Sequence, residues 1–166
     1  MKKLLLIIIL FGLQGYGQKT LEIYNFTAYT VVIADITTYA PGTTTEFSAD
    51  FGPIGPIALA PGASYTLQNT LSLTRFPFLS PSSSPTIDNW YRRTSPTNVT
   101  LMTSPAAWVL GNNQVFNRLS FRILDPNGSF GTVGVASPAI SGPGWDAIYD
   151  MSMSPPSAIT YTVVIF

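Results

Sequence analysis

Apolar and polar side chains alternate most clearly in residues 116–136, FNRLSFRILDPNGSFGTVGVA. Leu119, Phe121 and Ile123 are separated by polar neighbours, which is the period of a strand with one buried and one solvated face. The sequence DPNG at 125–128 interrupts this pattern, and apolar positions alternate again beyond it. Proline, asparagine and glycine favour a reversal of the chain. The stretch therefore predicts a β-hairpin.

Two further strands are predicted near the N-terminus. Residues 19–26 alternate in the same way, which indicates a half-buried strand. Residues 29–37, YTVVIADIT, are apolar on both faces, as expected of a central strand. Residues 38–56 are rich in threonine, proline and glycine, so they predict a long loop with a short edge strand near 46–51.

A second informative block covers residues 57–73. Pro61 and Gly62 form a turn signal, and Tyr65, Leu67, Leu71 and Leu73 then indicate a strand. The segment at 59–67, LAPGASYTL, resembles the hydrophobic-x-Pro-Gly-x-Ser-aromatic-x-Leu turn of exported bacterial β-sandwich modules. This resemblance implies an exported β-sandwich and carries over no functional residue.

The remaining chain shows short apolar runs separated by turn signals, without an apolar stripe of helical period. The predicted fold class is therefore all-β: a single antiparallel β-sandwich of the immunoglobulin-like or jelly-roll kind, with about eight strands. The other predicted segments are a surface loop at 77–96, a strand at 99–102, a strand or single helical turn at 106–110, a loop at 137–144, and strands at 145–151 and 159–166.

Residues 1–17 have the pattern of a secretory signal peptide. Two lysines precede an apolar run at 4–13, which is too short to span a bilayer as a helix. Small residues at 15 and 17 predict cleavage before Gln18. The alternatives are an uncleaved anchor or a buried helix. Cleavage would leave one domain, residues 18–166, with no integral membrane span, exported to the periplasm, the cell surface or the extracellular space.

Composition supports a packed β-protein in which charge has a small role. The chain is 46% apolar and 13% aromatic, which favours a folded core over disorder despite 14 prolines and 13 glycines. Loss of Lys2 and Lys3 with the leader would leave six basic and eight acidic residues, a net charge of −2. Such a balance gives no electrostatic reason to expect nucleic acid as a partner.

The chain has neither histidine nor cysteine. A Ser-His-Asp triad, a cysteine nucleophile and a zinc site of the usual kind are therefore excluded, and we predict no enzymatic activity, cofactor or metal site. Two chemistries stay open for the carboxylates of Asp146 and Asp150, with Asp88 as a third candidate. Paired carboxylates can hydrolyse glycosides, and loop oxygens can bind calcium. Turn formation is the simpler interpretation of these aspartates.

Aromatic residues beside proline- and glycine-rich segments are the best candidates for binding. Exposed flat rings stack on sugars or anchor protein interfaces, and we expect some of them, including Trp108, to lie at one end of the sandwich. The alternative is that the rings close the ends of the core under arginine side chains. The predicted ligand-binding residues are Trp90, Tyr91, Arg92, Trp145, Asp146 and Tyr149.

The leading functional hypothesis is a non-enzymatic exported β-sandwich that acts as a structural or interaction component of a cell-surface or extracellular assembly. It works with protein partners or by self-assembly, and the apolar end of the last strand, 163–166, is the expected edge for a partner strand. One alternative is a carbohydrate-binding module with a glycan as ligand. Another is a small outer-membrane β-barrel, because Val164 and Phe166 resemble the closing strand of such proteins.

Overall fold

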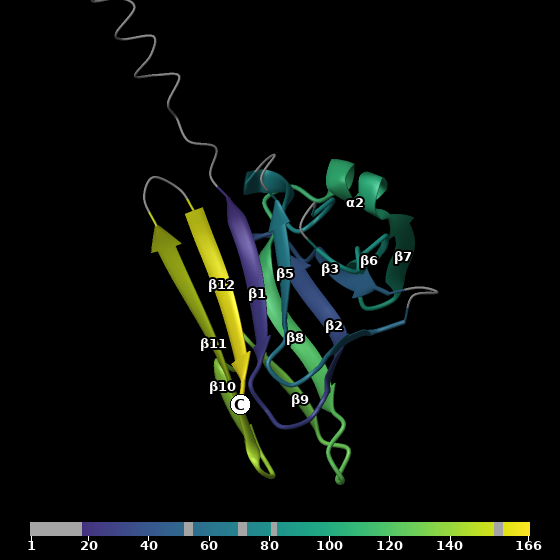
Figure 1. The fold of residues 1–166 in the computed structure, drawn as a ribbon. Helices are drawn as coiled ribbons and strands as arrows, with labels where there is room; N and C mark the ends of the chain where they lie inside the picture. The colour runs from purple at the N-terminus through teal and green to yellow at the C-terminus, as the bar shows by residue number, and fades with distance from the viewer. Residues whose placement is uncertain (1–17, 52–54, 70–72, 81–82, 155–157) are drawn as a thin grey trace, which may run out of the picture.

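The computed structural model describes residues 18–51, 55–69, 73–80, 83–154 and 158–166 (Figure 1). The signal peptide predicted for residues 1–17 lies outside this part of the chain. The elements in order are β1 Lys19–Asn25, β2 Val31–Tyr39, β3 Glu46–Asp50, β4 Ile57–Leu59, β5 Ser64–Asn69, the 3-10 helix η2 Leu73–Arg75, β6 Asn89–Ser95, β7 Asn98–Thr103, α2 Ser104–Leu110, β8 Val115–Ile123, β9 Phe130–Gly134, β10 Ala139–Gly142, β11 Trp145–Ser154 and β12 Ala158–Ile165.

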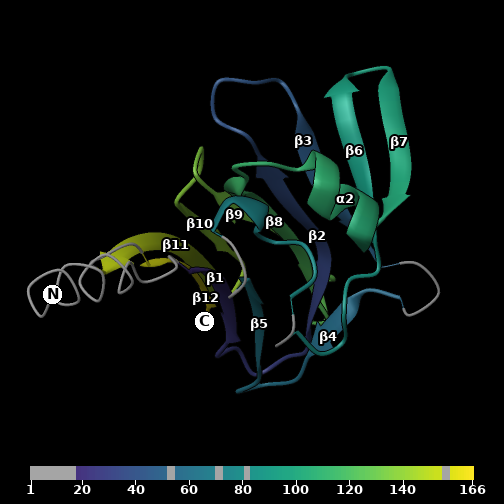
Figure 2. The ribbon, with the colours of Figure 1, turned by 90° about the horizontal axis from the view of Figure 1, so that it is seen from above.

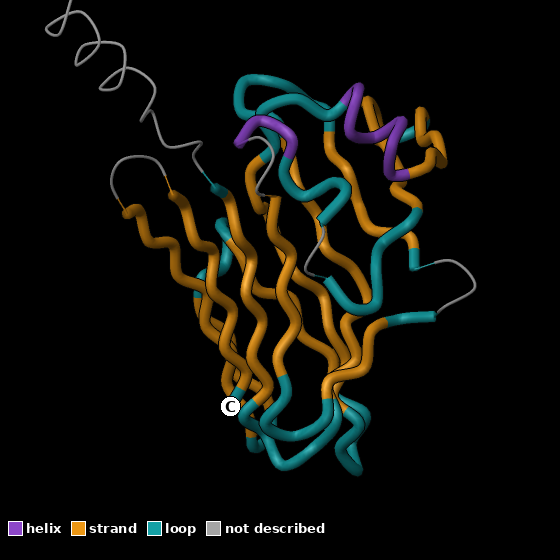
Figure 3. Tube along the Cα trace, turned by 45° about the horizontal axis from the view of Figure 1, so that its top comes forward, coloured by secondary structure: helices purple, strands orange, loops and turns teal. Residues whose placement is uncertain are grey.

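The described strands form two sheets that face each other (Figure 3). The first sheet has the order β10-β11-β12-β1-β5, and the second has the order β7-β6-β3-β2-β8-β9, with β4 also paired to β2. Neither order closes on itself. The predicted all-β fold is confirmed, and the two-layer arrangement is that of a sandwich.

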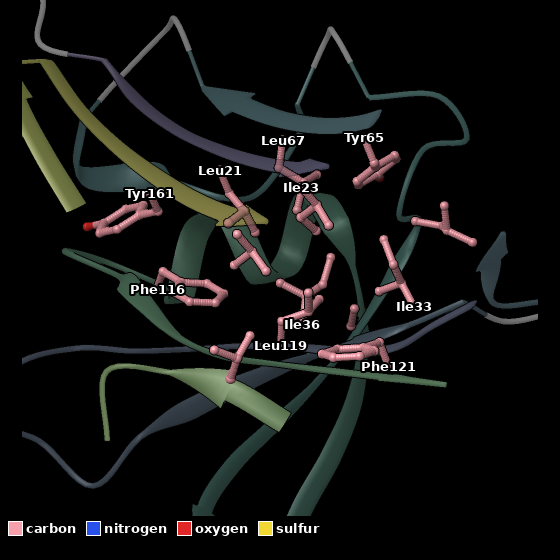
Figure 4. Packing of buried hydrophobic residues seen from close by; sticks show 14 of the residues in the cluster. Leu21, Ile23, Ile33, Ile36, Tyr65, Leu67, Phe116, Leu119, Phe121 and Tyr161 are labelled. Carbon is pink, nitrogen blue, oxygen red and sulfur yellow. The ribbon is translucent and has the colours of Figure 1, made fainter. Parts of the chain in front are cut away.

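The core lies between the two sheets (Figure 4). Leu21 and Ile23 come from the first sheet, and Ile36, Leu119 and Phe121 come from the second; all five side chains are fully buried. Alternation along each strand places these residues on one face, as the sequence predicted for β1 and β8. Because the chain has no cysteine, burial and strand pairing hold the layers together.

Strand β12 lies inside the first sheet, between β11 and β1. It runs antiparallel to β11 but parallel to β1, with Leu21 beside Tyr161 and Ile23 beside Val163. The prediction of a purely antiparallel sandwich is therefore wrong for this pair. The expectation of an open edge at residues 163–166 is wrong as well, since β12 is paired on both sides, as suits a strand that is apolar on both faces.

Strand β2 is central in the second sheet, as predicted. It pairs with β8 on one side, and with β3 and β4 at successive positions on the other side. The register with β8 shifts between Ile33 and Asp35 and again between Thr37 and Thr38. These irregularities break the strict alternation of the strand, and Thr37 and Thr38 are both buried although they are consecutive.

Three strands differ from the sequence predictions. Strand β3 is an interior strand between β2 and β6, although an edge strand was predicted. Strand β6 lies in the predicted loop at 77–96, and β10 lies in the predicted loop at 137–144. In β6, Trp90 faces the core, Tyr91 faces outward and Arg92 faces inward, half-buried. An arginine at an inward position hides the alternation of apolar and polar residues, because the residue is classed as polar although its apolar stem can be buried.

The segments around β6 are also more deeply packed than a surface loop. Phe78 is fully buried, and its ring makes edge contacts with Phe47 and Trp90, each at 5.0 Å between centroids. The region at 106–110, where a strand or a helical turn was predicted, belongs to helix α2, which starts with Pro105 in its first turn.

The described residues contain twelve strands, whereas about eight were predicted.

The β8–β9 hairpin is confirmed. Asp125 accepts hydrogen bonds from the backbone N–H of Ser129 at 2.8 Å and from its hydroxyl at 2.7 Å, and these bonds lower the pKa of Asp125. Gly128 has φ +61°, a left-handed conformation that glycine adopts without strain.

Asn25, at the C-terminal end of β1, connects three segments of the chain. Its side chain is fully buried, and its amide nitrogen donates to the carbonyl oxygens of Tyr29 and Leu59 at 2.8 Å and of Ala60 at 3.1 Å. Its carbonyl oxygen accepts from the backbone N–H of Thr27 at 3.0 Å and from its hydroxyl at 2.8 Å. One amide therefore satisfies buried groups of the β1–β2 and β4–β5 connections.

The partly buried position of the Asp35 carboxyl indicates that the stability of the protein depends on pH. Its Oδ2 accepts from the Thr37 hydroxyl at 2.8 Å, whereas its buried Oδ1 has no partner. Burial raises the pKa of Asp35 above the ordinary 3.8, partly offset by Thr37 and Arg118. The folded state therefore binds this proton more tightly than the unfolded state, so the contribution of Asp35 to stability is greatest at low pH and declines as the pH rises through the raised pKa.

We expect Asp35→Asn to raise the free energy of unfolding at neutral pH by about 1 kcal/mol and to flatten its pH dependence, because no charge then has to be buried. Urea denaturation across the acidic and neutral range measures both effects. Asp146→Asn, at an exposed position, is the control. An unchanged or steeper pH dependence in Asp35→Asn would contradict the argument.

Candidate functional site

The two tryptophans predicted to bind ligand are core residues in different sheets. Trp90 on β6 is fully buried, and its indole N–H donates to the Ser104 hydroxyl at 3.0 Å. Trp145 on β11 is 6% exposed and makes an edge contact with the Phe121 ring at 5.4 Å. The expectation that these rings form a common exposed surface is therefore wrong, because both complete the packing between the layers.

The other predicted binding residues are scattered as well. Tyr91 is exposed on the outer face of β6, and Arg92 is half-buried on the inner face. Asp146 is exposed on the outer face of β11, whereas Tyr149 is half-buried on its inner face. The six residues thus lie on two sheets and on opposite faces, and they do not form one site.

Trp108 on α2 is half-buried beneath Arg75, whose guanidinium lies 5.0 Å from the ring centroid. Arg75 also donates to the carbonyl oxygens of Trp108 and Val109, each at 2.9 Å. This is the arrangement of the alternative interpretation, in which an arginine covers an aromatic ring at the end of the core.

The candidate carboxylates do not converge. Asp146 and Asp150 are both exposed on the outer face of β11, four residues apart, which corresponds to about 13 Å along a strand. Glycosidase carboxylates lie roughly 5 to 9.5 Å apart across a cleft. Asp88 is exposed elsewhere, beside Trp90 at a separate hollow of about 230 Å³. In the described part of the chain, no three acidic side chains gather to hold a metal ion.

A cavity of about 410 Å³ lies at one end of the sandwich, between the β11–β12 hairpin of the first sheet and the ends of β2 and β8 in the second. None of the described residues that line it is charged. We call it the tyrosine–methionine cavity; its lining residues are Tyr39, Pro41, Val115, Phe116, Val135, Tyr149, Met151, Met153, Ile159 and Tyr161.

The wall from β11 follows from strand alternation. Trp145, Ala147, Tyr149, Met151 and Met153 occupy alternate positions, and exposure increases from Ala147 onward. The first two are buried, Tyr149 is half-buried, and Met151 and Met153 are 44% and 68% exposed. The inward, apolar face of β11 therefore continues beyond the region that the second sheet covers.

Strand β12 continues this wall. Register places Ile159 beside Met153 and Tyr161 beside Met151. Both methionines of β11 thus have an apolar neighbour on β12. The hairpin presents a continuous apolar surface to the cavity.

Three packed rings, tilted relative to one another, form the buried side of the cavity. Phe116 is fully buried and lies 5.2 Å from the Tyr149 ring and 5.9 Å from the Tyr161 ring, between centroids. Burial raises the pKa of Tyr161, and burial together with the neighbouring charge of Asp150 raises the pKa of Tyr149. Both phenols therefore stay protonated at neutral pH and are available as hydrogen-bond donors.

Polar groups close the core next to the cavity. Lys19, which is beside Ile159 in the register, donates its ammonium to the carbonyl oxygen of Gln114 at 2.7 Å. The Gln114 side-chain oxygen accepts from the Thr38 hydroxyl at 3.1 Å. Burial lowers the pKa of Lys19. Its charge is thus held by the backbone at this end of the core, outside the apolar lining of the cavity.

Sequence reasoning identified one residue of the cavity, Tyr149. Met151 and Met153 continue the alternation of apolar residues that includes Tyr149, and this pattern could have placed them on the same face. Their exposure, however, depends on where the opposite sheet ends. Tyr39 and Tyr161 come from distant strands, and no local pattern brings them together.

No protein-family model matches the chain, and a comparison with curated proteins gives no match. Of the helices in the described residues, none has the length and apolar character that crossing a bilayer requires. The functional argument therefore depends on the geometry of the cavity.

Proposed function

We propose that this protein is an exported, non-enzymatic β-sandwich that serves as an interaction component of a cell-surface or extracellular assembly. In this proposal, the tyrosine–methionine cavity receives apolar side chains of a protein partner. The observation that carries the proposal is the uncovered inward face of the β11–β12 hairpin, which ends in the exposed side chains of Met151 and Met153. Apolar surface of this kind at an open cavity is typical of an interaction site.

The lining supports a protein partner. Methionine side chains are flexible and polarisable, so they adapt to different apolar groups. Tyrosine combines a large apolar ring with a hydroxyl, and it is enriched at protein interfaces. A cavity of about 410 Å³ lies within the size range of natural binding pockets. Its walls offer no charged group to fix a charged substrate.

The separation of the carboxylates supports a role without catalysis. Asp146 and Asp150 face solvent on the outer side of β11, away from the cavity. The carbohydrate-binding alternative loses its main support, since a sugar platform needs exposed rings and the indoles of Trp90 and Trp145 are buried. We therefore prefer a protein partner to a glycan.

A random linear peptide library displayed on phage tests the cavity. We expect selected peptides to carry closely spaced aromatic or aliphatic side chains. Met151→Asp should weaken their binding by about 30-fold, because it places a charge in the apolar lining. Isothermal titration calorimetry measures the dissociation constants.

Ile148→Asp is the matched control. Ile148 lies on the same strand and is 42% exposed, close to the 44% of Met151, but it faces the other side of the sheet. Peptides that bind both variants equally would contradict the proposed site. If no peptide is selected while the uncharged dye N-phenyl-1-naphthylamine binds and is lost in Met151→Asp, the cavity serves a small molecule and the proposal of a protein partner fails.

Export is tested separately. We expect the full-length chain, expressed in a bacterium, to accumulate outside the cytoplasm with Gln18 at its N-terminus. Cell fractionation and mass spectrometry of the intact protein measure this. A cytoplasmic protein that retains residues 1–17 would contradict the proposed export and would leave the test of the cavity unaffected.

A further inference from the structure

Strand β7 is an edge strand of unusual character. It pairs with β6 on one side, and among the described residues no strand pairs with its other side. The β6–β7 hairpin stands at the margin of the second sheet (Figure 2). None of the six residues of β7 is buried, and its sequence, NVTLMT, has no charge, proline or glycine. Natural edge strands usually carry such residues because they prevent pairing with another chain.

Two other sheet margins, at β5 and at β9 and β10, are shielded. Next to β5, the backbone N–H of Gln68 donates to the Ser80 hydroxyl at 2.7 Å, and the Tyr65 hydroxyl donates to the carbonyl oxygen of Pro85 at 2.9 Å. Ser80 and Pro85, which follow β5 in the chain, therefore lie against this strand. At the opposite side of the sandwich, β9 contacts both β10 and β11, so the two sheets meet there. Among the described residues, no strand pairs with the free edge of β7, although helix α2 contacts both β6 and β7.

The outer face beside this edge is apolar. Val99 and Leu101 on β7 and Tyr91 on β6 are all exposed, and the register places Leu101 beside Tyr91. Thr100 lies between the two apolar residues and belongs to the inner face, beside Arg92. The edge thus offers unpaired backbone groups next to a small apolar surface.

We propose that β7 pairs antiparallel with β7 of a second copy of this chain, about a two-fold axis that passes through Thr100. Opposed residues of an antiparallel pair lie on the same face. This register places Val99 opposite Leu101 of the second copy, and Leu101 opposite Val99. Thr100 is opposite its own equivalent.

A second copy fits this edge because the pattern is symmetric about Thr100. The two outward apolar residues lie one position to either side, so a two-fold axis matches them in both directions. Because β7 carries no charge, its pairing with itself creates no like-charge contact within the new strand pair. Arg93 lies beside Val99 on β6, and in this register the two Arg93 residues are on the outer strands, with both β7 strands between them.

The expected dimer is weak in dilute solution. One strand pair of this length buries less than the roughly 1,200 Å² that stable interfaces need. Association therefore depends on concentration, and it becomes effective where copies are held close together. The inference does not depend on the tyrosine–methionine cavity, which lies at the β11–β12 hairpin.

Cysteine crosslinking tests the register, because the natural chain has no cysteine. In Thr100→Cys, the two new thiols are opposed at a Cα separation of about 4.5 to 5.5 Å, which suits a disulfide. We expect a covalent dimer under mild oxidation. Phe130→Cys, at an exposed position on the edge strand β9, is the control and should crosslink at least about tenfold more slowly.

Leu101→Lys is the second test. It introduces a charge opposite Val99 in both halves of the interface, and we expect at least about a tenfold increase in the dimer dissociation constant by sedimentation equilibrium. Circular dichroism confirms that each variant is folded. The proposal is overturned if Thr100→Cys crosslinks no faster than Phe130→Cys, if Leu101→Lys leaves the association unchanged, or if the unmodified protein stays monomeric at millimolar concentration.

Discussion

Replacing Trp90 with alanine is expected to lower the free energy of unfolding by about 4 kcal/mol. The indole is fully buried, lies 5.0 Å from the Phe78 ring and donates to Ser104. Its removal leaves a cavity between the second sheet and the segment that contains Phe78. Urea denaturation followed by circular dichroism measures the change.

Trp90→Phe is the control, because it keeps an aromatic ring and loses the hydrogen bond to Ser104. We expect it to cost about 1 to 2 kcal/mol, since the Ser104 hydroxyl still donates to the carbonyl oxygen of Ile87 at 2.9 Å. A loss below about 1 kcal/mol in Trp90→Ala would mean that the ring is not a core residue and would revive a role in ligand binding.

Asn25→Asp is expected to destabilise the protein by about 3 kcal/mol at neutral pH. The substitution keeps the size of the side chain but replaces the donating amide with a carboxylate oxygen, which then faces the carbonyl oxygens of Tyr29, Leu59 and Ala60. The unfavourable contacts should raise the pKa of the new carboxyl. The loss of stability should therefore shrink on acidification, because the protonated acid can again donate one hydrogen bond.

Denaturation at neutral and acidic pH measures both parts of this prediction. Asn98→Asp, at an exposed position of β7, is the matched control and should change stability by less than about 0.5 kcal/mol. A similar loss in the two variants would show that the buried hydrogen bonds of Asn25 have no special importance.

Local patterns predicted the elements whose signal is local. The β8–β9 hairpin was predicted because its alternation and its turn lie in one continuous stretch, and β1 and β2 were found for the same reason. Strand β6 was missed because Arg92 occupies an inward position with its apolar stem. The partner of β12 could not be predicted, since periodicity reports which face is buried and says nothing about which strand lies alongside.

The candidate site was predicted poorly for a related reason. Proximity to proline and glycine suggested that Trp90 and Trp145 were exposed, but burial of a ring depends on what the opposite sheet places over it. The tyrosine–methionine cavity arises where the β11–β12 hairpin continues beyond the second sheet. The position of this cavity depends on the relative lengths of strands that are far apart in sequence. A pattern within one stretch of residues therefore cannot reveal it.

The position of β12 between β11 and β1 constrains the order of events during synthesis. Strand β1 is made early and can pair with β5 on one side, but its neighbour on the other side, β12, is complete only when residues up to Ile165 have been made. Contacts of such long sequence separation form slowly, because a large loop must close first. The first sheet therefore stays incomplete, with one side of β1 unpaired, until β12 has been synthesised.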